Sequence, residues 1–378
     1  MSTLYIRHTD TAAEYVLAED GLPVRYEREE ADGRAACEDI YLAVVDRVMP
    51  GIGTAFVRLT KEINGCLPLN DRNRHLAVSG KRIPVQVKKE AHGEKLASVS
   101  DELTFAGTYA VLIPGSVKIS VSQRISDADE RKRLEITAAG LCPAGCGLIM
   151  RSDAAGAEEE TIASEIAVLY EKSERIQNAA RSVSAPCLLE MRPPVSEVIF
   201  REENGIEKAV SDREERLPCP VVFSASPFSL INAEDRLLKS FRRNIFLPCG
   251  GYITVDICEA LTVIDVNSGK YAGKKSGKEY SFLTVNREAA RECARILRLR
   301  NIGGNVIIDF IDMQSEASKN EVIRVMSEAL SRDPVKTVIH GFTSLGLLEL
   351  SRKRTGNMVS LPYIKETPHE SDHQDPGE

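Results

Sequence analysis

Two apolar runs in the last third of the chain end in side chains that carry oxygen. In LTVIDVNSGK, residues 261–270, Asp265 and Asn267 close the run two residues apart. Because successive side chains of a strand point to opposite faces, these two point the same way. A carboxylate and a carboxamide on one face are ligands typical of a hard cation such as Mg²⁺.

The stretch NVIIDFIDM repeats this pattern, with Asp309 directly after residues 306–308 and Asp312 three residues later. Strands interleave with helices in this region, which predicts an α/β sheet whose site forms beyond the carboxyl ends of strands. We therefore expect Asp265 and Asp309 to meet and, with Asn267, to hold one Mg²⁺ suited to phosphodiester hydrolysis. The ordinary alternative is that each Asp is a turn or cap residue.

Basic residues concentrate around these strands, although the net charge of −7 argues against a protein that coats nucleic acid indiscriminately. From Lys239 to Arg300 there are about twelve Lys or Arg against six Asp or Glu, which is typical of a phosphate-binding surface. Two groups could hold an RNA or DNA backbone: a loop with Lys270, Lys274, Lys275 and Lys278, and a helix face with Arg287, Arg291, Arg295 and Arg298. The ordinary alternative for such a loop is a solvated surface.

Composition sets the broad class. The chain has 378 residues, enough for two or three domains, and nine scattered cysteines, which favours reduced thiols in a cytosol. We find no signal peptide and no apolar run of membrane-spanning length, so a soluble, cytoplasmic protein is expected. The pair Cys142 and Cys146 lacks the two further ligands of a structural zinc site.

Local patterns predict the elements that position these groups. Residues 3–29 read as two strands joined at the turn Asp20-Gly21. Short alternating strands over 40–87 predict a small five-stranded barrel of the oligonucleotide-binding type. Residues 107–185 form a compact α+β unit with helices near 127–140 and 160–181, and residues 196–215 are predicted as a hairpin followed by a helix.

Three long blocks resemble the catalytic region of the ribonuclease E/G family in order and spacing: LPCGGYITVDICEALTVIDVNSGKY, LRLRNIGGNVIIDFIDM and HGFTSLGLLELSRKR. Earlier stretches are similar to other parts of that family. IYLAVVDRVMPGIGTAFVRL and GCLPL resemble its S1 domain, and GTYAVLIPG and CGLIMRS resemble its 5′-sensor domain. The chain is thus identified as a short member of this family.

The resemblance implies a multidomain α+β and α/β fold. The implied parts are an interrupted RNase H-like subdomain (1–38 and 186–238), an S1 RNA-binding barrel (39–106), a 5′-sensor domain (107–185), a DNase I-like catalytic domain (239–364) and a disordered tail (365–378).

The implied function is an Mg²⁺-dependent endoribonuclease in RNA processing, ribosomal RNA processing and messenger decay. It would cut single-stranded A/U-rich RNA to 5′-phosphate and 3′-hydroxyl ends and prefer 5′-monophosphorylated substrates. The family's metal-binding aspartates fall on Asp265 and Asp309, its third catalytic residue falls on Asn267, and Mn²⁺ is an alternative metal. A non-catalytic RNA-binding or regulatory member of the family is the alternative function.

Two further sites follow from the resemblance alone. The 5′-phosphate would be sensed by Gly107, Val111, Arg151, Ser152 and Lys336, and RNA would be bound by Phe56, Lys89 and Lys95. Lys336 stands where the family has an arginine, so sensing is expected to be weaker. Cys66 stands where the family has a second aromatic residue, so the barrel is expected to grip RNA less well. For Phe56 itself, barrel core remains an equal alternative.

The Cys-Pro-x-Cys zinc link of the family would follow GLLELSRKR, and the sequence does not contain it. No zinc-linked dimer is therefore expected, and a homo-oligomer held together without zinc stays open.

Overall fold

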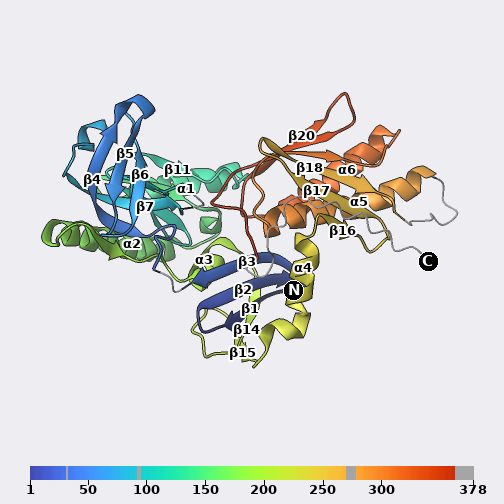
Figure 1. Cartoon of the computed structure of the whole chain (residues 1–378), viewed down its shortest axis with the longest axis horizontal. Coiled ribbons are helices and arrows are strands. Elements are labelled where there is room, and N and C mark those ends of the chain that lie inside the picture. The colour runs from blue at the N-terminus through green and yellow to red at the C-terminus, as the bar shows by residue number, and fades with distance from the viewer. Residues whose placement is uncertain (31–32, 92–94, 270–277, 362–378) are drawn as a thin grey trace. The chain divides into compact units, whose positions relative to one another are not determined.

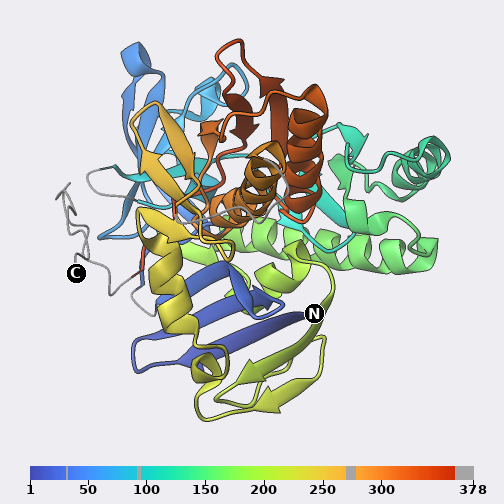
Figure 2. The same ribbon diagram turned by 90° about the vertical axis from the view of Figure 1, so that its right-hand side faces the viewer.

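A computed structural model describes residues 1–30, 33–91, 95–269 and 278–361. The chain forms two compact units (Figure 1; Figure 2). One unit contains Met1–Glu29 and the chain from Gly205 onward, and the other contains Glu30–Asn204. The architecture is a mixed α/β, multidomain one, as expected. Among the helices that the structure describes, none combines the length and apolarity needed to cross a membrane.

The first unit contains a five-stranded sheet built from two distant segments of the chain. Its strand order is β15-β14-β1-β2-β3. The bounds are β1 (Ser2–His8), β2 (Ala12–Glu19), β3 (Leu22–Glu30), β14 (Ile206–Ser211) and β15 (Val221–Phe223). Asp20 and Gly21 both have positive φ, as a two-residue hairpin turn requires, so the predicted turn between strands is confirmed. Phe228 of the 3₁₀-helix η4 (Pro227–Ile231) and Leu237 of α4 (Ala233–Phe241) pack in its core.

A six-stranded sheet in the same unit contains the predicted metal ligands. The strand order is β16-β17-β18-β19-β21-β20. The bounds are β16 (Asn244–Phe246), β17 (Tyr252–Ile257), β18 (Leu261–Asn267), β19 (Gly304–Asp309), β20 (Thr337–Phe342) and β21 (Leu348–Arg352). Strands β18 and β19 run parallel, whereas the pairs β16–β17, β17–β18, β19–β21 and β20–β21 are antiparallel. We call this sheet the six-stranded sheet.

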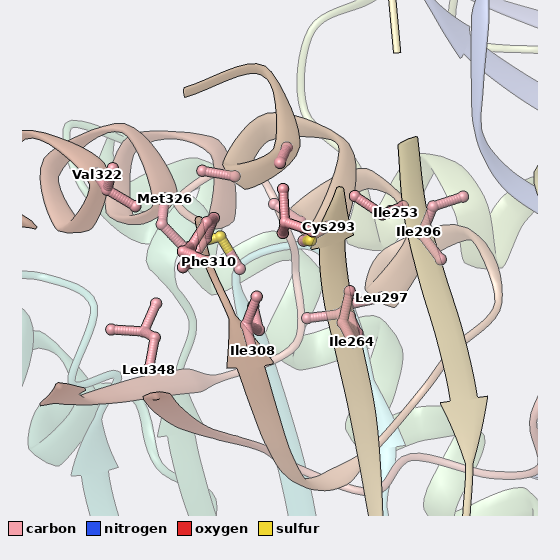
Figure 3. Close-up of a cluster of buried hydrophobic side chains, with 14 of the residues drawn as sticks. Ile253, Ile264, Cys293, Ile296, Leu297, Ile308, Phe310, Val322, Met326 and Leu348 are labelled. Atoms are coloured by element: carbon pink, nitrogen blue, oxygen red, sulfur yellow. The ribbon is translucent and has the colours of Figure 1, made fainter. Parts of the chain in front are cut away.

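Helices α5 (Lys278–Leu299) and α6 (Glu316–Leu330) supply the core of this sheet. Ile264 and Ile308 are fully buried and lie in one apolar cluster with Cys293 and Leu297 of α5 and Met326 of α6 (Figure 3). Burial of these side chains stabilises the sheet by roughly 1.5–3 kcal/mol each. Since side chains alternate along a strand, the neighbours of Ile264 and Ile308 point away from the helices. The other face of the sheet is therefore the one that can meet a substrate.

The second unit begins with a closed barrel of five strands. These are β4 (Ile40–Met49), β5 (Thr54–Arg58), β6 (Asn64–Pro68), β7 (Arg82–Lys89) and β8 (Ala97–Ser100), and β7 pairs with β4 to close the ring. The short helices η1 (Pro50–Ile52) and η2 (Arg74–Leu76) lie between strands, and β13 (Cys187–Glu190) adds to β4. The predicted five-stranded barrel is confirmed, and it is consistent with an S1-type domain.

The rest of this unit is a four-stranded sheet with two helices. Its strand order is β11-β12-β10-β9, and its elements are β9 (Phe105–Ala106), β10 (Ala110–Pro114), β11 (Ile119–Val121), α1 (Ala128–Leu141), β12 (Cys146–Met150), η3 (Ser152–Ala154) and α2 (Glu159–Ser182). The Asp127 side chain accepts from the Glu130 N–H and caps α1, as its position in the sequence predicts. Leu134 of α1 and Ile162 of α2 are fully buried in its core.

The prediction for residues 196–215 was wrong. The stretch begins with the helix α3 (Val195–Glu202), which follows Pro193 and Pro194, and only then comes β14. Val195 and Ile199 are buried four residues apart, which is helical spacing. The segment 212–216 is irregular and not helical.

The alternation along β18 gives a stability test. Ile264→Ala should lower the free energy of unfolding by about 2–5 kcal/mol, because it leaves a cavity beneath the sheet. Val263→Ala on the opposite, half-buried face is the matched control and should cost clearly less. Urea denaturation measures both, and equal losses for the two variants would contradict the assignment of faces.

Candidate active site and nucleic-acid interface

Asp265 and Asp309 lie directly opposite each other on adjacent strands. The parallel ladder pairs Ile264 with Ile308 and Asp265 with Asp309, so both carboxylates stand at the carboxyl ends of β18 and β19. Both residues are exposed and both point away from the helices. The meeting expected from the two apolar runs is thus present in the structure.

Asn267 joins them on the same face. Its Nδ2 donates a hydrogen bond of 2.6 Å to Asp265 Oδ2. A glycine just before β17 leaves room for this end of β18: a Cβ on Gly251 would lie 2.8 Å from the Asn267 carbonyl oxygen. Gly269, two residues further on, has φ of +55° and a Cβ there would meet the Gly250 carbonyl oxygen. The glycines beside the motif therefore let two backbone segments approach closely.

The charge of Asp265 acts on the ionisation of Asp309. Partial burial, followed by the charges of Asp265 and Asp312, raises the pKa of Asp309. Asp312 is exposed and contributes to this field from the loop after β19. A cation between Asp265 and Asp309 would relieve the repulsion.

The donor set fits a hard divalent cation. Two carboxylates and one carboxamide on one exposed face supply oxygen atoms, which Mg²⁺ and Mn²⁺ prefer. Over the described ranges, no three His, Cys, Asp or Glu side chains gather into a group that could hold a metal by themselves. Water or substrate oxygens would therefore have to complete the shell, as is usual for Mg²⁺.

Asn286 of α5 fixes the loop that follows Asp309. Its side chain is fully buried, its Nδ2 donates to the Ile311 carbonyl oxygen at 2.8 Å, and its Oδ1 accepts from the Ile311 N–H at 3.1 Å. Glu279 at the start of the same helix accepts from the Ser315 N–H and the Ser318 hydroxyl, both at 3.1 Å, and so caps α6. The sequence reasoning missed Asn286; the signal was a carboxamide on the apolar face of a helix.

Two of the four arginines on the expected RNA-binding face of α5 bond within the protein instead, whereas Arg291 is exposed. Arg295 donates to the Pro23 carbonyl oxygen at 2.6 Å, and Arg298 donates to Glu19 at 2.7 Å. Both therefore join α5 to the five-stranded sheet of the same unit. Arg287 contacts Glu321 of α6 at 3.4 Å. Lys270, Lys274 and Lys275 lie outside the described residues.

Barrel strands β4 to β8 align one outward row of side chains. Register pairs link Arg47 to Phe56, Phe56 to Cys66, Cys66 to Ser98, and Ser98 to Lys89. Phe56 is half-buried, while its neighbours Ala55 and Val57 are the ones inside the barrel. Phe56 is therefore a surface aromatic residue and not barrel core.

Two further cations belong to this surface. The Arg47 guanidinium lies over the Phe56 ring at 5.4 Å from its centroid. The sequence reasoning did not single out Arg47. Lys95 is exposed just before β8. Cys66 stands directly opposite Phe56, at the place where a second ring would extend the aromatic surface.

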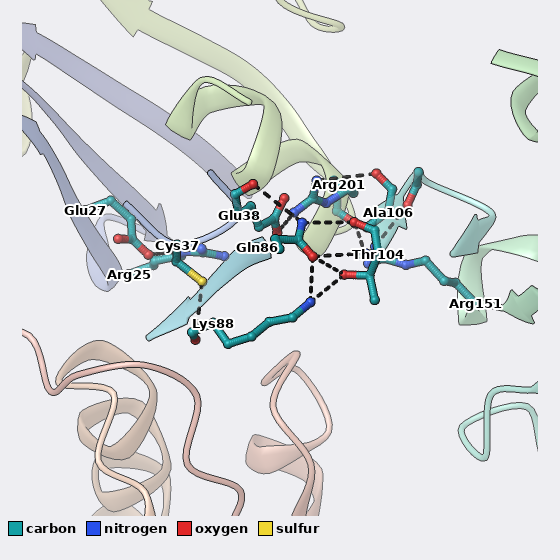
Figure 4. A network of polar contacts seen from close by, with 11 residues as sticks. Arg25, Glu27, Cys37, Glu38, Gln86, Lys88, Thr104, Ala106, Arg151 and Arg201 are labelled. Carbon is teal, nitrogen blue, oxygen red and sulfur yellow. Dashed lines mark hydrogen bonds and ion pairs between the residues drawn. The ribbon is translucent and has the colours of Figure 1, made fainter. Parts of the chain in front are cut away.

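The candidate 5′-sensor residues surround the turn between β9 and β10. Arg151 donates from Nη1 to the Gly107 carbonyl oxygen and from Nη2 to the Arg201 carbonyl oxygen, both at 2.9 Å (Figure 4). Burial, followed by the charge of Arg201, lowers the pKa of the Arg151 guanidinium. Val111 pairs with Ile149 on the neighbouring strand, and Ser152 begins η3 directly after Arg151.

A carboxylate that the sequence reasoning missed holds this turn in place. Glu165 of α2 accepts from the backbone N–H groups of Thr108, Tyr109 and Ala110 at 2.7, 2.8 and 3.0 Å. A Cβ on Gly107 would lie 2.4 Å from that carboxylate, so the glycine is required by close packing. Glu165 thus positions the backbone beside Arg151.

Lys336 belongs to the other unit. It lines a pocket of about 510 Å³ with Arg352, Lys353, Arg354 and the start of β19. Arg352 is buried against Asp333, with Nε 2.7 Å from its carboxylate, so part of this charge is neutralised. The pocket lies at the opposite end of β19 from Asp309, about 17 Å away along the strand.

Comparison with known proteins gives a consistent result. Residues 104–218 and 221–355 match the model of the family described as "Ribonuclease E/G family". The chain belongs to the ribonuclease E/G family. It is 36% identical over 363 residues to Ribonuclease E of Nostoc sp., which covers 87% of this chain and 53% of that protein. It thus spans about half the length of that relative.

Ribonuclease G proteins are similar over a larger share of their length. The Escherichia coli K12 protein is 30% identical over 373 residues, covering 89% of this chain and 76% of the relative. The Haemophilus influenzae protein is 30% identical over 403 residues, covering 97% and 82%. The sequence similarity therefore extends over most of this chain and is not limited to the three blocks quoted above.

The role of Asn286 in holding the loop after Asp309 can be tested by measuring the free energy of unfolding. Asn286→Leu should lower the free energy of unfolding by about 2 kcal/mol or more, because both backbone groups of Ile311 lose their partner. Asn305→Ala, at an exposed asparagine of β19, is the control and should change stability little. Thermal denaturation measures both, and a Leu variant as stable as wild type would contradict the role given to Asn286.

Proposed function

We propose that the protein is a divalent-metal-dependent endoribonuclease acting on single-stranded RNA. The observation that supports this best is the register pairing of Asp265 with Asp309 on an exposed sheet face, with Asn267 beside them. Membership of the ribonuclease E/G family supports RNA as the polymer that is cut. The flat, exposed setting of the carboxylates suits a chain that passes over them.

Asp265 and Asp309 would hold Mg²⁺, with Mn²⁺ as the alternative. When bound, the metal lowers the pKa of a water and stabilises charge on the phosphoryl oxygens. Asn267 orients Asp265 through its amide N–H and can present its own oxygen or N–H to a water or to the scissile phosphate. Cleavage would leave a 5′-phosphate and a 3′-hydroxyl.

The barrel surface and the candidate 5′-sensor residues would hold the substrate. The row containing Arg47, Phe56 and Lys89, with Lys95 near it, would bind A/U-rich single strands by stacking and phosphate contacts. Gly107, Val111, Arg151 and Ser152 would recognise a 5′-monophosphate. Lys336, which the sequence assigns to the same role, belongs to the other unit. Arg151 suits this role because a guanidinium has five N–H donors. In its contacts with the described residues, Nη1 uses one N–H for the Gly107 carbonyl oxygen and Nη2 uses one for the Arg201 carbonyl oxygen.

The alternative is a non-catalytic RNA-binding or regulatory protein. Cys66 favours it, because a thiol in place of a ring weakens grip without touching Asp265 or Asp309. Lys336 favours it in the same way, because an ammonium lacks the two-pronged geometry of an arginine. A protein that binds RNA and cuts none of it with Mg²⁺ or Mn²⁺ would establish this alternative.

Asp265→Asn and Asp309→Asn should each abolish cleavage of a 5′-monophosphorylated A/U-rich RNA in Mg²⁺, because each removes one of two ligand charges. The measurement is product formation on a gel, with analysis of the new ends. Asp256→Asn is the control and should retain cleavage. It changes a carboxylate of β17 on the same sheet, which is bonded to Arg243 at 2.6 Å and is paired in register with Val263 rather than with Asp265 or Asn267.

Chelation by EDTA should stop cleavage, and excess Mg²⁺ should restore it. If all three variants cut as fast as wild type, the activity comes from a contaminant and the proposal fails. If Asp256→Asn alone cuts, the two paired aspartates carry the activity as proposed.

Cys66→Phe should tighten RNA binding by about 5- to 150-fold, the equivalent of one added stacking contact of 1–3 kcal/mol. The physical reason is that the new ring would stand directly opposite Phe56 on the barrel surface. Cys66→Leu is the matched control, because it adds apolar bulk without a π-face. Fluorescence anisotropy of labelled single-stranded RNA measures the affinity, and equal gains for Phe and Leu would exclude stacking as the cause.

A further inference from the structure

Two aromatic rings lie on the six-stranded sheet outside its hydrophobic core. Phe246 of β16 is 77% exposed, and its ring centroid lies 5.9 Å from that of Tyr252 of β17 with an interplanar angle of 52°. The preceding residue, Ile245, is 5% exposed and packs among the core side chains. The strand thus buries one apolar side chain beneath the sheet and presents the other to solvent.

The register places these rings beside the candidate active site. Phe246 pairs with Tyr252, and Tyr252 pairs with Asn267. Residues directly opposite each other in antiparallel strands share a face, so all three side chains lie in one row on the exposed face. Neighbouring strands are about 4.8 Å apart, which places Phe246 about 10 Å from Asn267. Asp265 is two residues from Asn267 on the same face.

The surroundings of the rings favour an uncharged, flat occupant. The next row contains Asn244 and Thr254, which bond to each other at 3.1 Å, and continues through Asp265 to Asp309. The ion pair of Arg243 with Asp256, also on this side of the sheet, neutralises both charges. Among the described residues of these two rows there is no cation to bind a phosphate, whereas a nucleobase finds a π-face and polar edges.

We propose that Phe246 and Tyr252 form a stacking platform for a nucleobase that flanks the phosphate cut at Asp265 and Asp309. This inference rests on the proposed function. A single strand whose phosphate reaches the carboxylates must continue over the neighbouring surface, and the aromatic row is the adjacent surface of β16 and β17. The platform holds any base, because every base has a π-face.

The test uses a short single-stranded RNA with one cleavage site and a series in which an abasic nucleotide moves across that site. With wild-type protein, kcat/KM should fall about 5- to 150-fold when the abasic position coincides with the platform. Phe246→Leu should lose a similar factor on intact RNA and should show no additional loss at that abasic position. Phe246→Trp, which keeps a ring, should retain wild-type behaviour.

A matched control separates the platform from general surface effects. Phe223 is 70% exposed on β15, in the other sheet of the same unit. Phe223→Leu should leave both kcat/KM and the abasic profile unchanged. Thermal denaturation of the Leu variants checks that both fold, which their exposure favours.

Three results would overturn the platform. One is a flat abasic profile for wild type, and another is a Phe246→Leu variant with the wild-type profile. The third is a change of mass by light scattering in Phe246→Leu with base dependence intact, which would make the rings a contact between copies of the chain. If wild type cuts no RNA, the proposed function fails on its own. Binding of intact and abasic RNA to wild type and Phe246→Leu then decides the platform separately.

Discussion

The parallel pairing of β18 with β19 is the constraint on which the candidate active site depends. One register fixes two things at once: it places Ile264 and Ile308 against the helices and Asp265 opposite Asp309 on the other face. A slip of one residue would expose the apolar side chains and bury the carboxylates. The same strand register therefore determines both the core packing and the positions of the carboxylates. The hydrophobic effect that stabilises this register also holds two like charges side by side.

The elements around this pair serve to keep it in place. α5 buries Asn286 against the loop after Asp309, and the same helix reaches the five-stranded sheet through Arg295 and Arg298. Two of the guanidinium groups that a charge count assigns to RNA are used inside the unit. Next to the carboxylates, the exposed face of the six-stranded sheet presents polar and aromatic side chains. Rigid support on one face and an open opposite face are what a site acting on a polymer needs.

Local patterns predicted the parts of this arrangement that depend on local physics. The alternation in LTVIDVNSGK and NVIIDFIDM identified the strands, their buried faces and the residues at their ends, and Asp127 predicted the start of α1. Partners distant in sequence could not be read in this way. Glu165 contacts a turn more than fifty residues earlier, and a sequence does not state which of its many carboxylates meets which backbone N–H group. For α3, β-prone residues such as Val195 and Ile199 also fit helical spacing, and packing decided between the two.

The sheet that joins β1 to β14 has a consequence for how the chain folds. β1 pairs in parallel with β14, so Thr3 meets Lys208 only after some two hundred residues have been made. The intervening Glu30–Asn204 is a compact unit with its own barrel and hydrophobic cores. During synthesis this inserted unit can fold first. The N-terminal strands can complete their sheet only after β14 has been synthesised. Closing a loop of this length costs conformational entropy. The cost is lower when the inserted unit is already folded, because its two ends are then held in fixed positions.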